Sequence, residues 1–394
     1  MADLKKELTH EDNKSTEIEI RWLNEDDMVK AGVLDAGRCV DVMEETMGLM
    51  EDGDAIMGGP SHSEHGIMLY FPKKSSIPGF PLNDSRDRRF IAMPAYVGNR
   101  FHMVGCKGYG SNGRNRSKGL PRSILMMSLN DVETGAPLAY MSANLLSSIR
   151  TGAMPGLAAK LLAKPDSEVL SIIGPGVINK ACLMAIMSKK KKLHTVKIKG
   201  SSPSSETALS MKKFIEEHFP QIKTIILCET LEEAIRGADI VSEAVSCKEG
   251  EWPRFEAEWF KPGVTVICTS TFNMDFQEII PFRKVVDNYK MFENYAIEDQ
   301  NQMMKNGIRQ HTGCMGEDFV YMVQDGLIRR DSIDQLGEIV RGKKTARKRE
   351  DEIILVSIEG MPVEDVAWGY ECYKRAKEMS IGTDLKLWDH PLAF

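Results

Sequence analysis

The sequence predicts an α/β protein in which a doubly wound parallel sheet is joined to a second, α+β domain. Three observations support this prediction. An apolar run at 169–173 leads through a glycine turn at 174–176 into a helical stretch. Short β-branched runs separated by helical segments continue as far as residue 288, which is typical of a parallel sheet covered on both faces. Before residue 150, strand-like runs lie between glycine turns, which indicates a mixed sheet.

The first part of the chain has the pattern of an α+β domain. Residues 1–17 are expected to form a flexible tail. A helix is expected over 35–51, and another over 143–162 leads into the parallel sheet. Between these helices we expect strands at 66–72, 89–97, 101–110, 122–131 and 133–142, the last two forming a hairpin.

The glycine turn and the segments behind it have the arrangement of a Rossmann dinucleotide-binding unit. Gly174 lets the chain turn sharply, and Gly176 lets the backbone approach a pyrophosphate at the positive end of the next helix. Asn179 stands where the usual motif has its third glycine. Further strands are expected at 194–200, 224–229, the end of 231–246, 263–271 and 283–288.

A coenzyme on such a sheet lies at the carboxyl ends of the strands. The residues expected around it there are Gly174, Gly176, Val177, Ile178, Ser201, Ser202, Val245, Thr269 and Ser270. The end of the second strand, where NAD sites place an acidic residue, has no carboxylate before Glu206. Lys199 and the serine hydroxyls at 201–205 can instead accept a 2′-phosphate, so we expect NADP or NAD, with NADP preferred.

The region after residue 288 is helical and ends in a long helix. We expect this helix to pack back on the first domain and make that domain discontinuous. The expected boundaries are 18–150 with 345–394 for the α+β domain and 151–344 for the Rossmann domain.

Composition argues against several classes of protein. The chain of 394 residues is long enough for two domains, and its formal net charge of -6 disfavours nucleic-acid binding. No apolar stretch approaches the roughly 20 residues that span a bilayer, and the charged N-terminus lacks a signal-peptide core. The eight cysteines form no C-x-x-C pair and the histidines no helix-spaced ligand pair, so we expect a cytoplasmic protein without a metal site. The KKKK run at 189–192 indicates a solvated helix end.

Four stretches, at 105–125, 131–164, 174–176 and 339–369, carry a resemblance across residues 18–385. In order and spacing they are similar to the ornithine cyclodeaminase/μ-crystallin family, and most similar to a long-chain bacterial branch of it that is labelled tyramine oxidase. The resemblance implies a homodimer or a multiple of it, in which the α+β domains serve dimerisation and substrate binding. It also implies a small amine or amino-acid-like substrate held between the domains.

The resemblance assigns roles to individual residues. Lys107 matches the active-site lysine of the family, and we expect its ammonium to project from a strand end. A surface lysine is the alternative. Arg150 matches the arginine that pairs with a substrate carboxylate near the nicotinamide; its alternative is a structural ion pair. Thr151 either caps the helix or touches the coenzyme, and Gly360 is expected beside the substrate.

Two departures from the family pattern bear on the reaction. His62 stands where many members have a substrate-binding arginine. Phe272 or Asn273 stands where true cyclodeaminases have a catalytic aspartate, and Asp275 comes too late in the chain. We include Asn273 among the substrate-binding residues. Without that carboxylate, ring-closing deamination lacks the group that activates the second amine, whereas plain hydride transfer does not need it.

The predicted function is therefore that of an NAD(P)-dependent oxidoreductase, with Lys107 and Arg150 as its catalytic pair. It would transfer hydride to or from the C–N bond of an amino acid, imino acid or amine, as a dehydrogenase or imine reductase. Two alternatives remain open: an ornithine cyclodeaminase-like ammonia lyase, and a non-catalytic μ-crystallin-like protein that binds NADPH and a small ligand.

Overall fold

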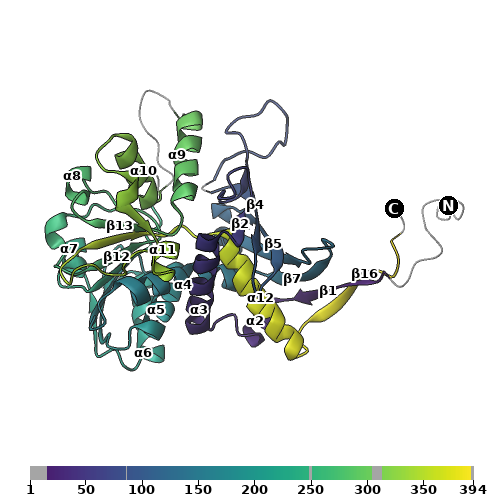
Figure 1. Cartoon of the computed structure of the whole chain (residues 1–394), viewed down its shortest axis with the longest axis horizontal. Coiled ribbons are helices and arrows are strands. Elements are labelled where there is room, and N and C mark those ends of the chain that lie inside the picture. The colour runs from purple at the N-terminus through teal and green to yellow at the C-terminus, as the bar shows by residue number, and fades with distance from the viewer. Residues whose placement is uncertain (1–15, 86, 248–250, 304–312, 392–394) are drawn as a thin grey trace, which may run out of the picture. The chain divides into compact units, whose positions relative to one another are not determined.

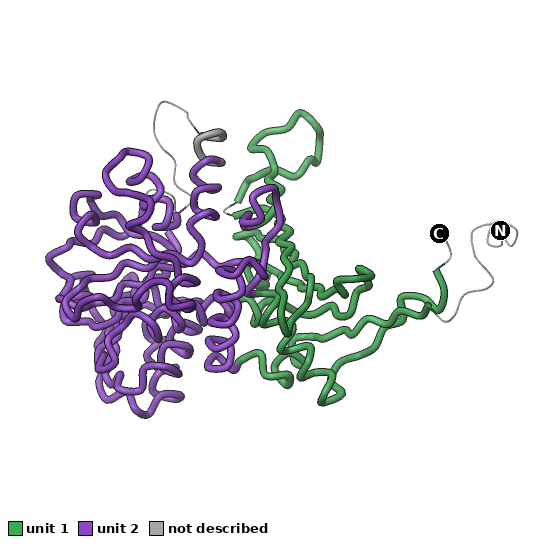
Figure 2. Tube along the Cα trace, viewed as in Figure 1, with its two compact units in different colours: residues 1–34, 66–147, 365–394 green, residues 35–65, 148–364 purple. Residues whose placement is uncertain are grey.

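The computed structural model describes residues 16–85, 87–247, 251–303 and 313–391. The chain forms two compact units, each built from segments distant in sequence (Figure 2). The first unit comprises residues 1–34, 66–147 and 365–394, and the second comprises residues 35–65 and 148–364. An α+β unit and an α/β unit are thus confirmed as the components of the fold.

The first unit is built on a mixed sheet with the strand order β16-β1-β7-β6-β5-β4, and β3 pairs with β4. Its strands pair antiparallel, except that β1 runs parallel to β7. The bounds are β1 Ile18–Leu23, β3 Ile67–Tyr70, β4 Arg89–Val97, β5 Met103–Ser111, β6 Ser123–Asn130, β7 Pro137–Ser142 and β16 Thr383–Trp388, with helix α2 at Glu25–Lys30.

The long C-terminal helix α12 (Pro362–Glu378) completes the core of the first unit. Trp368 is fully buried, and its indole N–H donates a hydrogen bond to the carbonyl oxygen of Val33. Gly369 packs close to Met127 and Met141 on strands β6 and β7. The expectation that this helix returns to the first domain and makes it discontinuous is confirmed.

The second unit contains a fully parallel sheet with the strand order β10-β9-β8-β11-β12-β15-β13-β14. Helices α5 and α6 lie on one side of it and α9 and α10 on the other (Figure 1). The strand bounds are β8 Val169–Ile173, β9 Thr195–Lys199, β10 Thr224–Leu227, β11 Ile240–Glu243, β12 Thr265–Cys268, β13 Arg283–Val286, β14 Ile333–Gln335 and β15 Ile354–Ser357. The main helices are α3 Ala36–Asp52, α4 Asn144–Leu162, α5 Val177–Lys189, α6 Glu206–His218, α7 Leu231–Ile235, α8 Phe276–Ile279, α9 Tyr289–Met303, α10 Met315–Gln324 and α11 Leu336–Val340.

Two segments lie in the second unit although the sequence placed them in the α+β domain. The first carries α3, which packs against α5 and α11. There is no space for a side chain at Gly156 of α4, because an added Cβ would lie 2.6–2.7 Å from Ala185 and Val40. The second segment carries β15, which is hydrogen-bonded between β12 and β13. The close helix packing and the ladder hydrogen bonds explain why both segments join the parallel sheet.

Candidate active site

The glycine turn lies at the carboxyl end of β8, as predicted. Gly174 has a φ of +79°, and a Cβ there would lie 2.7 Å from the carbonyl oxygen of Ala244. Gly176 is the N-cap of α5, and a Cβ there would have no atom within 4 Å. Val177 follows as the first helical residue and is 69% exposed. The first N–H groups of α5 therefore border open space, which suits an anionic group.

Asn179 replaces the third glycine of the motif and ties two strand ends together. It is fully buried, and its amide nitrogen donates to the carbonyl oxygens of Ile173 at 2.8 Å and Gly174 at 2.9 Å. Its amide oxygen accepts from the hydroxyl of Ser242 at 2.6 Å. Where a glycine would bring helix and strand together by its small size, Asn179 does so with hydrogen bonds, so its presence is compatible with a coenzyme turn.

The ends of β11 and β12 carry the next predicted coenzyme residues. The hydroxyl of Thr269 donates to the carbonyl oxygen of Glu243 at 3.0 Å, and that of Ser270 donates to the carbonyl oxygen of Val245 at 2.9 Å. These bonds fix the backbone of both loops at the edge where a coenzyme lies in this class of sheet.

Glu243, the last residue of β11, is a feature that the sequence reasoning missed. It is fully buried, and one carboxylate oxygen accepts from the N–H of Val245 at 2.7 Å. Burial raises the pKa of this carboxyl to about 8, against the opposing effect of the Val245 N–H and of the Cys268 thiol. An acidic residue that ends a buried β-branched run is a signal that could have identified it.

The loop after β9 carries the serines proposed to select the coenzyme. Ser201 is exposed and Ser202 partly so, and the hydroxyl groups of Ser202 and Ser204 lie 3.3 Å apart. The ammonium of Lys199 donates to the carbonyl oxygen of Gly200 at 2.6 Å. The loop therefore presents hydroxyl groups to solvent at the end of the second strand.

Arg150 lies within α4 and is 4% exposed. Its guanidinium pairs with the fully buried carboxylate of Glu364 at 3.0 Å. Gly360 faces the same guanidinium, since a Cβ there would lie 2.2 Å from Nη1 of Arg150. Gly360 also has a φ of +92°, so both sterics and backbone conformation require glycine. The structure confirms that an ion pair exists at Arg150.

Asp287, at the end of β13, holds the turn that contains Gly360. Its carboxylate accepts from the N–H groups of Glu359 at 2.9 Å, Gly360 at 3.4 Å and Asn288 at 2.7 Å. Burial raises the pKa of this carboxyl to about 6, and the three N–H donors oppose that rise. The sequence reasoning missed Asp287, although its position after the apolar strand 283–286 resembles that of Glu243.

Lys107 is 2% exposed, so it is not a surface lysine. Its ammonium pairs with the fully buried carboxylate of Asp365 at 2.7 Å and donates to the hydroxyl of Ser147 at 3.3 Å. The ammonium also lies 5.8 Å from the ring centre of Tyr109. The expectation that Lys107 projects from a strand end is wrong, because β5 continues to Ser111 and places Lys107 in mid-strand.

Three other predicted residues have different surroundings from those expected. Thr151 lies inside α4, which begins at Asn144, so it does not cap that helix. His62 is exposed, has a φ of +54° and lines a cavity of about 240 Å³ that Asp287 and Asn288 also line. No group of three metal-ligating side chains occurs in the described ranges.

The segment after β12 has no carboxylate where cyclodeaminases need one. Phe272 is 2% exposed and stacks on Phe255, with ring centres 4.1 Å apart. The side-chain amide of Asn273 donates to the carbonyl oxygen of Trp252 at 3.1 Å. Asp275 forms a capping box at the start of α8 and pairs with Arg254 at 3.2 Å. The structural roles of these residues agree with the departure seen in the sequence.

Among the described helices, none is both long and apolar enough to cross a membrane.

Curated relatives of the chain are enzymes of amino-acid metabolism. The N-((2S)-2-amino-2-carboxyethyl)-L-glutamate dehydrogenase of Staphylococcus aureus is 28% identical over 94% of this chain and 99% of its own length. The alanine dehydrogenase of Archaeoglobus fulgidus is 27% identical over 82% of this chain and 91% of its own. A Delta(1)-pyrroline-2-carboxylate reductase of Bacillus cereus is 28% identical over 66% of this chain and 73% of its own.

Solved structures share the fold over nearly the whole chain. The Thermococcus litoralis Delta(1)-pyrroline-2-carboxylate reductase, in complex with NADH and L-proline, matches with a TM-score of 0.74 at 22% identity, covering 93% of this chain and 100% of the other. An archaeal alanine dehydrogenase dimer with bound NAD matches with a TM-score of 0.73 at 24% identity, covering 94% and 100%. A model of the ornithine cyclodeaminase/mu-crystallin family matches residues 33–380, and the chain belongs to this family.

Proposed function

We propose that the protein is an NAD(P)-dependent oxidoreductase that transfers hydride to or from the C–N bond of an amino acid, imino acid or amine. The observation that supports this most is the burial of Lys107, whose ammonium is 2% exposed in the middle of a strand. Burying a cation is costly unless it is paired, and a buried Lys107–Asp365 pair is seldom retained for stability alone. The names of the curated relatives, dehydrogenases and a reductase of amino and imino acids, support the same reaction class.

The residues at the carboxyl ends of the parallel strands fit a dinucleotide. When bound, the nicotinamide coenzyme supplies or accepts the hydride. We propose that the N–H groups at Gly176, Val177 and Ile178 hold its pyrophosphate at the start of α5. The loops at Val245 and at Thr269–Ser270 would border the rest of the coenzyme, since their backbones are fixed at the same edge.

The two buried cations have separate proposed roles. The ammonium of Lys107 would donate to the substrate atom on which charge develops, a nitrogen or an oxygen, because it is a positioned donor with little access to water. The guanidinium of Arg150 would bind a substrate carboxylate through its planar fork, and Glu364 holds that guanidinium in place until substrate binds. His62 and Asn273 remain proposals for substrate contacts, as does Gly360.

Ring-closing deamination is the less favoured alternative. Such a reaction needs a carboxylate to activate the second amine, and the equivalent position is occupied by Phe272, which is buried against Phe255. A binding protein without turnover is the other alternative. It would have no need of a desolvated lysine beside the ligand.

The resemblance to the tyramine oxidase branch makes tyramine a substrate to test beside amino acids. Purified protein should be screened against panels of amino acids, imino acids and amines, with both coenzymes, by following the absorbance of the reduced nicotinamide. Coenzyme-dependent turnover of at least one C–N substrate is expected. Coenzyme binding without turnover of any panel member would favour the binding-protein alternative.

We also propose that the protein forms a cytoplasmic homodimer through its first unit. Ile67 and Leu69 of β3 and Phe90 of β4 are each more than half exposed, and they form an apolar face on an otherwise folded sheet. Light scattering should report twice the chain mass at micromolar concentration, and Leu69→Glu with Phe90→Glu should lower it to one chain. A monomeric wild-type protein would contradict the proposal.

A further inference from the structure

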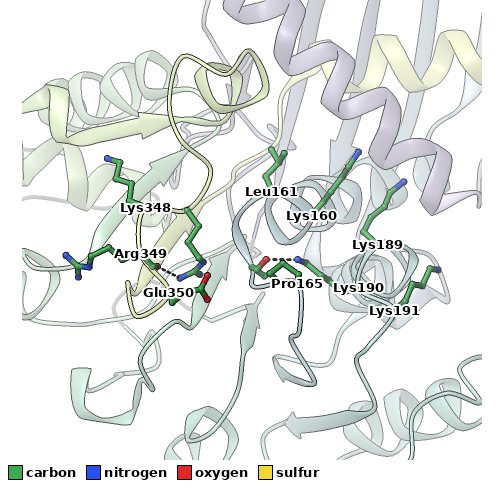
Figure 3. A pocket seen from close by; sticks show the side chains of 11 residues that line it. Lys160, Leu161, Pro165, Lys189, Lys190, Lys191, Lys348, Arg349 and Glu350 are labelled. Atoms are coloured by element: carbon green, nitrogen blue, oxygen red, sulfur yellow. Dashed lines mark hydrogen bonds between the residues drawn. The ribbon is translucent and has the colours of Figure 1, made fainter.

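A basic cavity in the second unit lies outside the proposed coenzyme and substrate residues. It has a volume of about 560 Å³ and is lined at the end of α4, at the end of α5 and by the segment before β15. Figure 3 shows Lys348 and Arg349 on one side and the lysines of α4 and α5 on the other. The cations that line it are Lys160, Lys189, Lys190, Lys191, Arg347, Lys348 and Arg349, and the one lining carboxylate is Glu350.

Two of these cations stabilise the end of α4. The guanidinium of Arg347 donates to the carbonyl oxygen of Leu162 at 2.9 Å, and the ammonium of Lys190 donates to that of Ala163 at 2.6 Å. Cations at a helix C-terminus complement its partial negative charge. This role explains the buried position of Lys190 and the half-buried position of Arg347, but not why five further cations surround them.

The remaining cations are only partly neutralised. Lys160 and Lys189 pair with acidic residues of α3, and Arg349 pairs with Asp351 in a largely exposed contact. Lys191 is exposed, and no carboxylate lies within salt-bridge distance of it in the described part of the chain. The lining therefore keeps an excess of positive charge, although the chain as a whole has a net charge of -6.

The electrostatic effect of this crowding is visible at Lys190. Burial, and then the neighbouring Arg347, lower the pKa of its ammonium to about 8, while Asp166 acts in the opposite direction. Cations held this close together repel one another, so an anion bound among them would gain attraction from each. Leu161 and Pro165 add apolar surface to the same cavity.

We propose that this cavity binds the oligophosphate chain of a small molecule, such as inorganic triphosphate or a nucleoside triphosphate. Lysine and arginine together suit phosphate oxygens, and the volume is in the range of small-ligand sites. The Gly174–Gly176 turn precedes the first residue of α5, whereas the lysines of the cavity follow its last turn. Oligophosphate and coenzyme therefore bind at opposite ends of α5 and do not compete.

The test uses the full chain saturated with NADH and titrated with inorganic tripolyphosphate in a calorimeter. Saturable binding with a Kd below about 1 mM is expected at low salt. It should weaken as ionic strength rises, because the site is partly exposed to solvent. Titrations with ATP and with adenosine separate recognition of the phosphate chain from recognition of a base. Displacement of tripolyphosphate by NADH would overturn the proposal.

Variants locate the binding. Lys191→Gln with Lys348→Gln and Arg349→Gln removes three exposed cations without touching the two that stabilise α4, and should weaken tripolyphosphate binding at least about tenfold. The matched control replaces Lys212, Lys213 and Lys223 by Gln, an equal charge change on the same unit outside the cavity lining. It should leave binding within about twofold.

Glu350→Gln supplies a test of opposite sign. It removes the one carboxylate of the lining, so binding should tighten by about two- to fivefold. Equal loss in the two triple variants would mean that net charge alone attracts the anion, and would overturn the site. Binding of a single-stranded oligonucleotide that is tighter than that of tripolyphosphate, with the same dependence on Lys191, Lys348 and Arg349, would assign the cavity to nucleic acid instead.

Discussion

The two units treat their buried cations alike and their sheets differently. In the first unit Lys107 extends from a strand to Asp365, and in the second Arg150 extends from a helix to Glu364. Both carboxylates are fully buried and are consecutive residues of α12. The same helix thus supplies the counter-ion for each proposed catalytic cation, although the cations arise from different kinds of secondary structure.

The sheets differ in what covers them. Strands β11, β12 and β15 of the second unit are buried along their whole length, whereas the strands of the first unit alternate between buried and exposed residues. The exposed side of the first sheet carries Ile67, Leu69 and Phe90, which are apolar. The parallel sheet is complete within one chain, and the mixed sheet has an apolar face that a second chain would cover.

The largest expected effect breaks the comparison on the side of the first unit. Lys107→Met should lower turnover about 10²–10³-fold while coenzyme affinity stays nearly unchanged, because a preorganised donor to the reacting atoms is lost. The substitution also leaves the carboxylate of Asp365 buried without its main cation, at a cost of about 3–5 kcal/mol of folding free energy. Steady-state kinetics and a thermal melt measure the two effects.

A double variant separates chemistry from stability. Lys107→Met with Asp365→Asn removes both charges, so its melting temperature should recover toward that of the wild type while turnover stays low. Full activity of either variant on the best substrate would show that Lys107 is not the catalytic donor.

The second prediction concerns the buried carboxyl of the parallel sheet. Glu243 has a pKa raised from 4.5 to about 8, so the folded protein keeps a proton that the unfolded chain releases above pH 4.5. Folding stability should therefore fall as pH rises from about 4.5 to 8 and level off above that range. Glu243→Gln mimics the protonated form, and should be more stable than the wild type at pH 8 by about 2–4 kcal/mol.

Urea unfolding of the wild type and Glu243→Gln at pH 5 and pH 8 measures this difference. The difference should be small at pH 5 and large at pH 8, because both proteins are neutral at this position in the acidic sample. An equal difference at the two pH values would mean that Glu243 is ionised in the fold throughout this range.

The sequence predicted the second unit more fully than the first, for physical reasons. Its strands are continuous apolar runs and its turn needs Gly174, so local pattern determines both. In the first unit, the glycines around Lys107 suggested a strand end. A Cβ at Gly105 would lie 2.6 Å from Met127, and one at Gly110 would lie 2.8 Å from Phe90. These glycines serve close packing within the sheet, which depends on partners distant in the chain.

The partners of the site residues were also beyond local pattern. Lys107 and Arg150 were identified by resemblance, but nothing in the sequence paired them with Asp365 and Glu364, which lie more than 200 positions later. The hydrogen bonds of Asn179 depend in the same way on Ser242 of another strand.

The third prediction concerns the buried cation of the second unit. Arg150→Met with Glu364→Gln removes the ion pair without leaving a buried charge. It should raise KM about tenfold or more for substrates with a carboxylate and have much less effect on a simple amine such as tyramine. Parallel kinetics on an amino acid and an amine make the measurement. Equal losses on both would assign Arg150 to the architecture of the unit.

The smallest expected effect concerns the coenzyme itself. The loop after β9 presents serine hydroxyls where NAD sites place a carboxylate, and the nearest one in the chain, Glu206, begins the following helix. NADPH should therefore bind at least about tenfold more tightly than NADH, a difference of roughly 1.4 kcal/mol. Fluorescence titration of the reduced coenzymes measures it, and Ser201→Asp should reverse the preference because a carboxylate there repels the 2′-phosphate and accepts from a ribose diol. Ser210→Asp, on the face of α6, is the matched charge control and should leave the ratio unchanged. Tighter binding of NADH by the wild type would make this an NAD site that recognises the ribose without an acidic residue at the end of the second strand.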